Sequence, residues 1–123
     1  MTQRIFNALI RTHHITSRKK IQRLRKAATE HSVHHVLIRS GGAPGIMYAE
    51  AVEEASVREW VDAVQALRYK DFRCVFKPAP AVVNELAQPG FQEVGAVSEF
   101  AKEMERRGLG SWWRRGMGYE SAE

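Results

Sequence analysis

The stretch HHVLIRSGGAPGIMYAEA (residues 34–51) decides the predicted fold. Residues 34–39 are rich in branched apolar side chains, which is typical of a buried strand. GGAPG (residues 41–45) supplies turn chemistry, because glycine tolerates positive φ angles and proline fixes its own φ. Residues 46–51 are apolar again, so the sequence predicts two antiparallel strands joined by a loop.

Helical patterns flank this hairpin on both sides. Between residues 17 and 30, apolar side chains recur at helical spacing; they are Ile21, Leu24 and Ala28. A second apolar stripe consists of Val57, Trp60, Val61, Val64 and Leu67. Both stripes predict amphipathic helices that bury one face. Ser56 and Glu59 match the S-x-x-E pattern, which predicts a capping box at the start of the second helix.

Two further segments complete the pattern. Residues 4–11 are compatible with a strand, and residues 70–77 alternate, which places Phe72, Cys74 and Phe76 on one side. We expect Pro78 and Pro80 to end that strand. The order β-α-β-β-α-β predicts an α+β, ferredoxin-like fold: a four-stranded antiparallel sheet with two helices on one face.

The predicted domain organisation is a single domain over residues 1–123, with its core at about 4–77 and a C-terminal extension at about 78–123. Residues 81–95 are predicted to form a loop, and a third helix is expected to start near Val97. A tail that contains Trp112 and Trp113 is expected to dock on the domain, at the open sheet face or its edge.

The composition points to an anionic partner. The 123 residues carry a net charge of +5, and the calculated pI is about 9.7. Such a balance suits RNA, DNA or an acidic protein face. The single cysteine, Cys74, cannot form an intramolecular disulfide, which predicts an intracellular location, nuclear or cytoplasmic. No run approaches the roughly 20 apolar residues that span a bilayer, so no membrane partner is expected.

The segment RTHHITSRKKIQRLRK (residues 11–26) holds the main candidate site. Its cations fall in the first turn of a predicted helix, where the helix dipole favours anions. A phosphate bound there would remove the conflict, and its predicted ligands are His13, His14, Thr16, Ser17, Arg18, Lys19 and Lys20. Lys19, Arg23 and Lys26 form a basic stripe that could follow a nucleic-acid backbone. The alternative is a solvated helix face whose long side chains cover apolar surface.

The sheet offers further candidates. Tyr48 lies on a predicted central strand and could stack on a base. Arg73 and Lys77, together with Arg39, could hold phosphates on the open face or could simply be solvated. The histidines lack the spacing of a zinc site, so no metal and no cofactor are predicted.

An enzyme is the less favoured alternative. The predicted order, with a basic loop before the first helix, resembles that of acylphosphatase, whose chemistry needs an arginine in the loop and an asparagine on the second strand. The asparagines of this chain are Asn7 and Asn84, and neither lies on that strand. Cys74 is predicted to be inert core.

Three segments carry a resemblance to a known family. THHITSRKK, APGIMYAE and REWVDAVQALRYKDFRCVFK resemble the C-terminal domain shared by small RWD-domain-containing proteins and the spliceosomal pre-mRNA-processing factor three. The matching residues are His13, His14, Ile15, Ser17, Arg18, Lys19, Lys20, Pro44, Gly45, Trp60, Leu67 and Tyr69. The resemblance covers roughly residues 5–77 and implies a ferredoxin-like fold that, in the splicing factor, binds small nuclear RNA. The tail FAKEMERRGLGSWWRRGMGYE resembles the ending of the RWD-type members.

These observations predict a module that binds RNA or another polyanion through residues 11–26 and is not an enzyme. The alternative is a protein-interaction domain that docks a protein partner through its C-terminal helix and its Trp-containing tail.

Overall fold

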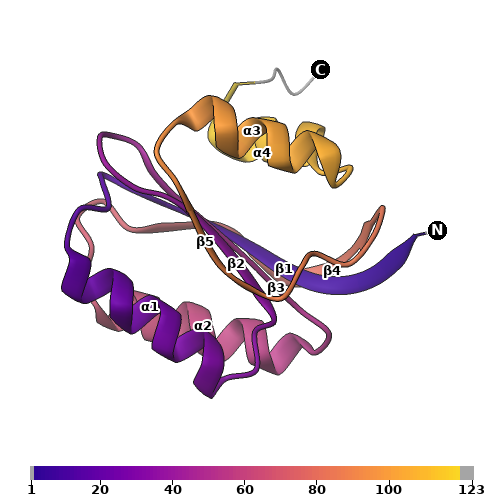
Figure 1. The fold of residues 1–123 in the computed structure, drawn as a ribbon, viewed down its shortest axis with the longest axis horizontal. Coiled ribbons are helices and arrows are strands. Elements are labelled where there is room, and N and C mark those ends of the chain that lie inside the picture. Colours follow the sequence, from indigo (N-terminus) through magenta and orange to yellow (C-terminus); the bar gives the residue numbers. More distant parts are fainter. Residues whose placement is uncertain (1, 120–123) are drawn as a thin grey trace.

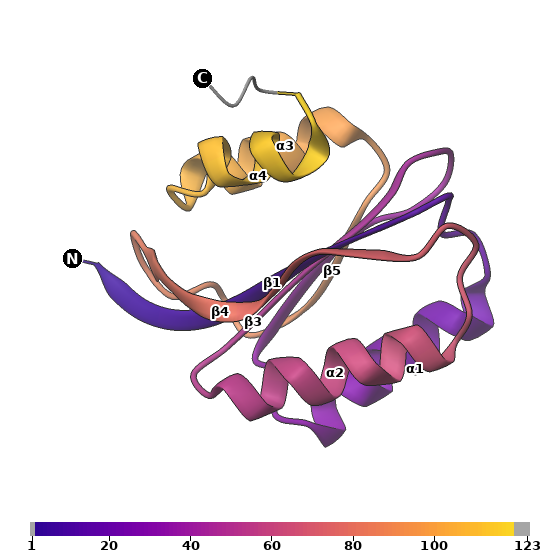
Figure 2. The ribbon, with the colours of Figure 1, turned by 180° about the vertical axis from the view of Figure 1, so that it is seen from behind.

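The structure, a computed structural model, describes residues 2–119 and contains a five-stranded sheet between two pairs of helices (Figure 1). The elements in chain order are β1 (Gln3–Thr12), α1 (Arg18–Glu30), β2 (His35–Arg39), β3 (Gly45–Ala51), α2 (Glu54–Ala66), β4 (Arg73–Val83), β5 (Gly90–Val94), α3 (Val97–Arg106) and α4 (Gly110–Met117). Helices α1 and α2 cover one face of the sheet, and α3 and α4 cover the other (Figures 1 and 2). Residues 1 and 120–123 of the predicted domain lie outside the described part.

The strand order is β4-β1-β3-β2-β5, and β5 runs parallel to β2 whereas the other neighbours are antiparallel. The α+β, ferredoxin-like order of the first four strands and two helices is confirmed. The predicted sheet of four antiparallel strands is wrong, because residues 90–94 form a fifth strand instead of a loop. This strand is short and follows a Pro-Gly turn signal, so only its pairing with β2 reveals it. It covers the open edge of β2, whose side chains are almost all buried.

Strand β4 departs from the prediction in two ways. It runs past Pro78 and Pro80, because it is an edge strand, where a residue without an N–H group is tolerated. Its register with β1 shifts on both sides of Leu9, which marks β-bulges. Cys74 therefore packs toward α1 and α2, whereas Phe76 packs toward α3 and α4. The predicted placement of both side chains on one face is wrong for this reason.

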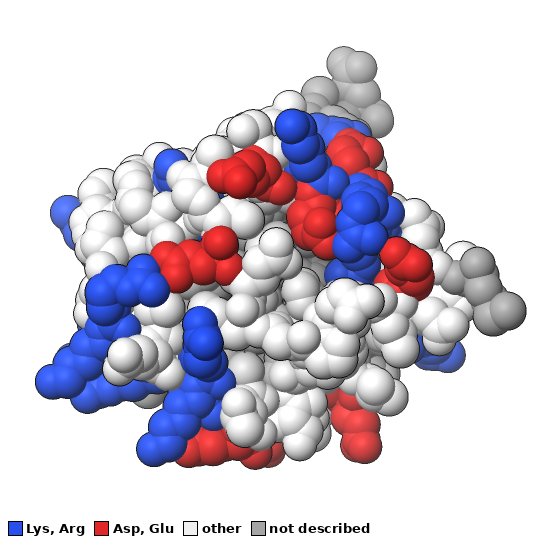
Figure 3. All heavy atoms as spheres, in the orientation of Figure 1, with Lys and Arg blue, Asp and Glu red and all other residues white. Residues whose placement is uncertain are grey.

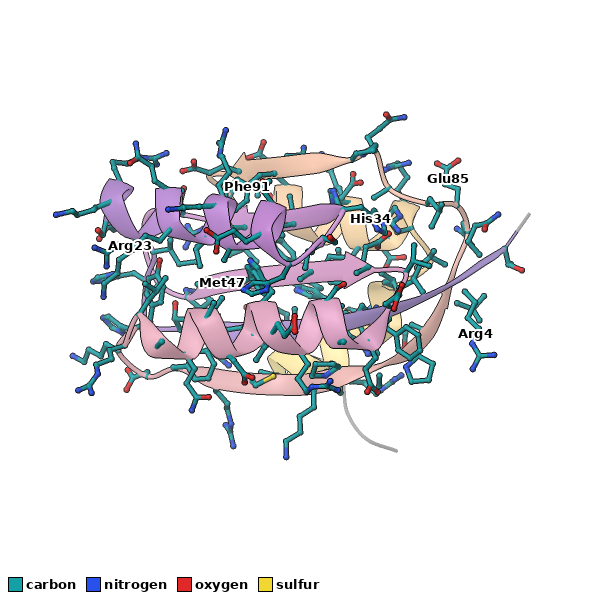
Figure 4. All side chains as sticks on the ribbon, turned by 90° about the horizontal axis from the view of Figure 1, so that it is seen from below. Arg4, Arg23, His34, Met47, Glu85 and Phe91 are labelled. Atoms are coloured by element: carbon teal, nitrogen blue, oxygen red, sulfur yellow. The ribbon has the colours of Figure 1, made fainter. Side chains whose placement is uncertain are left out.

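The first core lies between the sheet and the helices α1 and α2. Its buried helical residues are Ile21, Leu24, Ala27 and Ala28 in α1, and Val57, Trp60, Val61 and Val64 in α2. Both predicted stripes are thus confirmed. Trp60 Nε1 donates to the Leu24 carbonyl over 3.1 Å and links the two helices, and Met47 of the sheet lies between them (Figure 4). The predicted capping box is wrong, because α2 begins at Glu54 and Ser56 lies within its first turn.

The C-terminal extension closes the opposite face of the sheet. Its buried apolar residues are Phe100, Met104, Leu109, Trp113 and Met117. The Trp112 ring stacks on Phe76 with a centroid distance of 4.8 Å and meets Tyr48 edge-on at 5.8 Å. The prediction that the Trp-containing tail docks on the domain is confirmed, and the sheet face is where it docks. Tyr48 has an exposed fraction of 0% as a result.

A buried ion pair joins this extension to the sheet. Arg107, which follows the last residue of α3, donates from Nη2 to Glu50 Oε1 over 2.6 Å, and neither side chain is exposed. Glu50 also accepts from the Tyr48 hydroxyl (2.7 Å) and lies 2.9 Å from His34 Nε2. Burial raises the pKa of Glu50, but the hydrogen bonds from His34, Tyr48 and Arg107 outweigh it and lower that pKa to about 2. Glu50 is therefore held as a carboxylate.

Glu50→Gln should lower the free energy of unfolding by about 3–5 kcal/mol near neutral pH, because Arg107 then stays buried without a counter-charge. The folded-state pKa of about 2 is below the usual value of about 4.3 for an unfolded chain. The carboxylate therefore contributes its full stability above about pH 4.3 and loses it as the pH falls toward 2. The difference in the free energy of unfolding between wild type and Glu50→Gln should therefore shrink as the pH falls from about 4.3 to about 2.

Urea denaturation at several pH values measures this difference. Asp62→Asn, at an exposed position of α2, is the matched control and should change stability by less than about 0.5 kcal/mol. A loss below about 1 kcal/mol for Glu50→Gln would contradict the assigned role of the ion pair.

Candidate nucleic-acid interface

Three loops meet at one end of the sheet, which we call the loop end; they are residues 13–17, 40–44 and 67–72. Backbone hydrogen bonds hold them together. His13 N donates to the Lys70 carbonyl and Gly41 N donates to the Ile15 carbonyl, both over 2.9 Å. Ile15 has no exposed surface and anchors the first loop in the core. The loop end lies on the left side of Figure 1, where α1 begins.

One of the cations at the start of α1, Arg18, is already balanced by an acidic residue of this chain. Ser17 is the N-cap, and its Oγ accepts from Lys20 N over 3.2 Å. Arg18 donates from both terminal nitrogens to the Glu93 carboxylate over 2.7 and 2.8 Å. Hydrogen bonds from Arg18 and from Ser40 lower the pKa of Glu93 to about 2. An external anion is therefore not needed to balance Arg18.

Glu93 is the residue of this corner that the sequence does not reveal. It lies 75 residues from Arg18, on β5, the strand that has no clear sequence signal. A helix start and a distant short strand share no local pattern. Their proximity depends on the parallel pairing of β5 with β2.

Lys20, in the first turn of α1, lines a hollow of about 230 Å³ together with cations of the loop 67–72. The residues around it are His14, Thr16, Ser17, Lys20, Arg68, Tyr69 and Lys70. The structure thus brings four predicted site residues together with Arg68 and Lys70, which the sequence analysis missed. The Arg-Tyr-Lys triplet just before a strand was the available signal. Lys20 Nζ lies 4.8 Å from the centroid of the Tyr69 ring, a cation–π contact.

The loop that supplies these two cations is strained. Arg68 and Asp71 have φ angles of +57° and +56°, in the left-handed region. That conformation costs a non-glycine residue roughly 1–2 kcal/mol. Strain of this kind collects at functional sites, where the surrounding structure holds it in place. In this turn, Arg68 and Lys70 flank the buried Tyr69 in sequence.

His13 lies on the other side of the first loop from His14. It lines a hollow of about 400 Å³ together with Arg11, Thr12, Ala43, Pro44, Asp71 and Arg73. Its Nδ1 atom is 3.7 Å from Asp71 Oδ2. The two histidine rings are neighbours, with centroids 4.9 Å apart, but they face different hollows.

The predicted basic stripe continues from the loop end along α1. Lys19, Arg23 and Lys26 are exposed, and Lys26 lies 3.8 Å from Glu30. Lysine and arginine side chains cover the lower left of Figure 3, where Figure 1 places the beginning of α1. Figure 4 shows Arg23 at this end of the molecule, far from Arg4 and Glu85. The stripe begins at Lys19, the neighbour in sequence of Lys20, which lines the hollow.

Two residues of the predicted site, Tyr48 and Lys77, lie away from the loop end. Tyr48 cannot stack on a base, because α4 covers the sheet face that it occupies. Lys77 does not share a face with Arg73, since the bulged strand turns it toward α2, where it lines a groove with Glu54 and Asp62. The expected placement of both cations on an open sheet face is therefore wrong. Arg73 lies at the loop end instead.

The chemistry of the loop end is that of cationic and hydrogen-bond donor groups. Within residues 2–119, no group of three or more His, Cys, Asp or Glu side chains is placed to hold a metal ion. The helices of the same part of the chain are too short or too polar to cross a membrane. Burial raises the pKa of the Cys74 thiol, and Cys74 donates to the Phe76 carbonyl.

Substitution of Arg18 or of Lys19 by glutamate should change the free energy of unfolding in opposite directions. Lys19→Glu replaces an unfavourable first-turn cation and should raise the free energy of unfolding by about 0.3–1 kcal/mol. Arg18→Glu places two carboxylates together at Glu93 and should lower the free energy of unfolding, although the helix dipole alone would favour an acid at this position. Urea denaturation at low salt compares the two variants with wild type. Equal shifts in one direction would show that Glu93 does not stabilise the helix start.

Comparisons with known proteins name no family. No protein-family model and no curated protein sequence matches this chain. Among solved structures, the chain is similar to an acylphosphatase from Bacillus subtilis. The identity is 15%, the match covers 73% of this chain and 98% of that chain, and the TM-score is 0.47.

Proposed function

We propose that this protein is a non-enzymatic module that binds RNA through the phosphates, at the loop end and along the outer side of α1. The observation that carries the proposal is the hollow beside Lys20. Three of its lining residues are cationic, namely Lys20, Arg68 and Lys70, and no acidic residue is among the described residues that line it. The resemblance to the splicing-factor domain implies the same class of ligand.

Because helices cover both faces of the sheet, the loop end and α1 are favoured over the sheet face as the RNA-binding surface. Bases cannot reach the central strands, because the C-terminal helices cover them. A single strand that follows α1 would meet Lys19 and Arg23 after leaving the hollow, both exposed. Phosphate contacts of this kind give strong salt dependence and weak sequence preference.

Two alternatives have less support. Docking of a protein through the Trp tail would need exposed indole rings, but Trp113 is 3% exposed and Trp112 is stacked on Phe76. Chemistry of the acylphosphatase type would need an asparagine on the second strand, but Asn7 lies on β1 and Asn84 follows β4. Asn7 donates to the Tyr48 hydroxyl and Asn84 donates to the Arg106 carbonyl.

The double variant Arg68→Asn/Lys70→Gln tests the proposal. Asparagine tolerates the left-handed φ of position 68, so the loop should keep its shape while the surface loses two charges. Titration of a labelled single-stranded RNA at several salt concentrations should show weaker binding. The slope of log K against log salt should fall by roughly 0.7 for each phosphate that the protein no longer neutralises, or about 1.4 for both cations together.

The matched control removes two charges elsewhere. Arg4 and Lys102 are exposed, and within the described chain neither forms an ion pair. Arg4→Gln/Lys102→Gln should keep most of the affinity and the wild-type salt slope. Equal losses in both double variants would mean that only the net charge matters, and RNA binding that is absent in wild type would refute the proposed function.

A further inference from the structure

Two arginines face each other at the loop end, and within residues 2–119 neither forms an ion pair. Arg11 of β1 is the direct cross-strand partner of Arg73 of β4, and both side chains are exposed. Like charges at directly opposite positions of a strand pair destabilise a sheet. We call these two residues the arginine pair.

Arg39 lies on the same rung of the sheet, but its side chain has a structural role. Arg11 and Arg39 are both paired with Ile46, so the three arginines lie on one rung. Arg39 donates to the carbonyls of Gly95 (3.1 Å), Pro44 (3.2 Å) and Gly42. Arg39 thus fixes the loop 40–44, whereas the described part of the chain provides no such hydrogen bonds to the side chains of the arginine pair.

The arginine pair lines two hollows. On one side lies the hollow of about 400 Å³ that His13 and Asp71 also line. On the other side lies a hollow of about 370 Å³, which Gly116 of α4 borders. Asp71 is the acidic residue among the described lining, and its carboxylate faces His13 at 3.7 Å. The first hollow has the volume of a small-ligand site.

We propose that the arginine pair binds a terminal phosphate of an RNA chain, an inference that rests on the proposed function. A phosphate monoester carries about −1.5 to −2 charges near neutral pH. It matches two guanidinium groups better than an internal phosphodiester, which carries one negative charge. Guanidinium groups present paired donors that fit phosphate oxygens. The loop end would then bind internal phosphates beside Lys20 and a chain end at Arg11 and Arg73.

The test compares one RNA sequence with three kinds of ends: a 5′-phosphate, a 3′-phosphate, or hydroxyl groups at both ends. A phosphorylated end should bind about tenfold more tightly than the hydroxyl ends, the gain expected of a charge-assisted hydrogen bond. Arg11→Gln/Arg73→Gln should remove this preference, so that the variant binds the phosphorylated and the hydroxyl-ended RNA equally. The double variant Arg4→Gln/Lys102→Gln should keep the preference.

Further measurements separate the remaining explanations. The glutamine variant should be as stable as wild type or more stable, because repulsion is relieved; lower stability would assign the arginine pair a structural role at the end of α4. Arg11→Lys/Arg73→Lys keeps the charge and should lose part of the preference. Equal binding of all three RNAs would overturn the inference while leaving RNA binding intact. Binding of inorganic phosphate without any end preference would also overturn it, and no RNA binding at all would refute both proposals.

Discussion

Burial of both sheet faces is the constraint on which the rest of the structure depends. One face packs against α1 and α2, and the other against α3 and α4, where Trp113 stacks on Phe100 with a centroid distance of 5.9 Å. A ferredoxin-like sheet with a free face can present its central strands to a ligand. In this chain that face is filled, so a large ligand cannot lie on the central strands.

The buried Glu50–Arg107 pair connects the two halves of this arrangement. Glu50 lies on a central strand, and Arg107 follows α3, so the C-terminal extension is tied to the sheet by charge as well as by apolar packing. Removal of one partner of a buried pair leaves the other without compensation. The extension is therefore an integral layer of the fold. The loops that follow the C-terminal end of β1 lie outside these two layers, and His14, Lys20, Arg68 and Lys70 line a hollow there.

Much of the fold follows from local patterns, and the rest depends on pairing between distant segments. The hairpin of residues 34–51 and the stripe around Trp60 have periodicity that predicts their structure directly. Strand β5 does not, because its five residues, which begin at the glycine of the Pro89-Gly90 turn, become a strand only beside β2. The same limit applies to the site. His14, Ser17 and Lys20 lie within seven residues of the sequence and are predictable, whereas Glu93 reaches the helix start only through the fold.

We expect RNA to bind at the loop end while α3 and α4 keep the sheet face covered. Backbone amide chemical shifts, measured during titration of isotope-labelled protein with single-stranded RNA, test it most directly. The predicted result is that the largest shift changes fall in residues 13–20 and 67–73 and that the amides of β3 and α4 keep their positions. Large changes at Tyr48, Trp112 and Trp113 would show that α4 leaves the sheet and that the covered face is the binding surface, which would contradict this account.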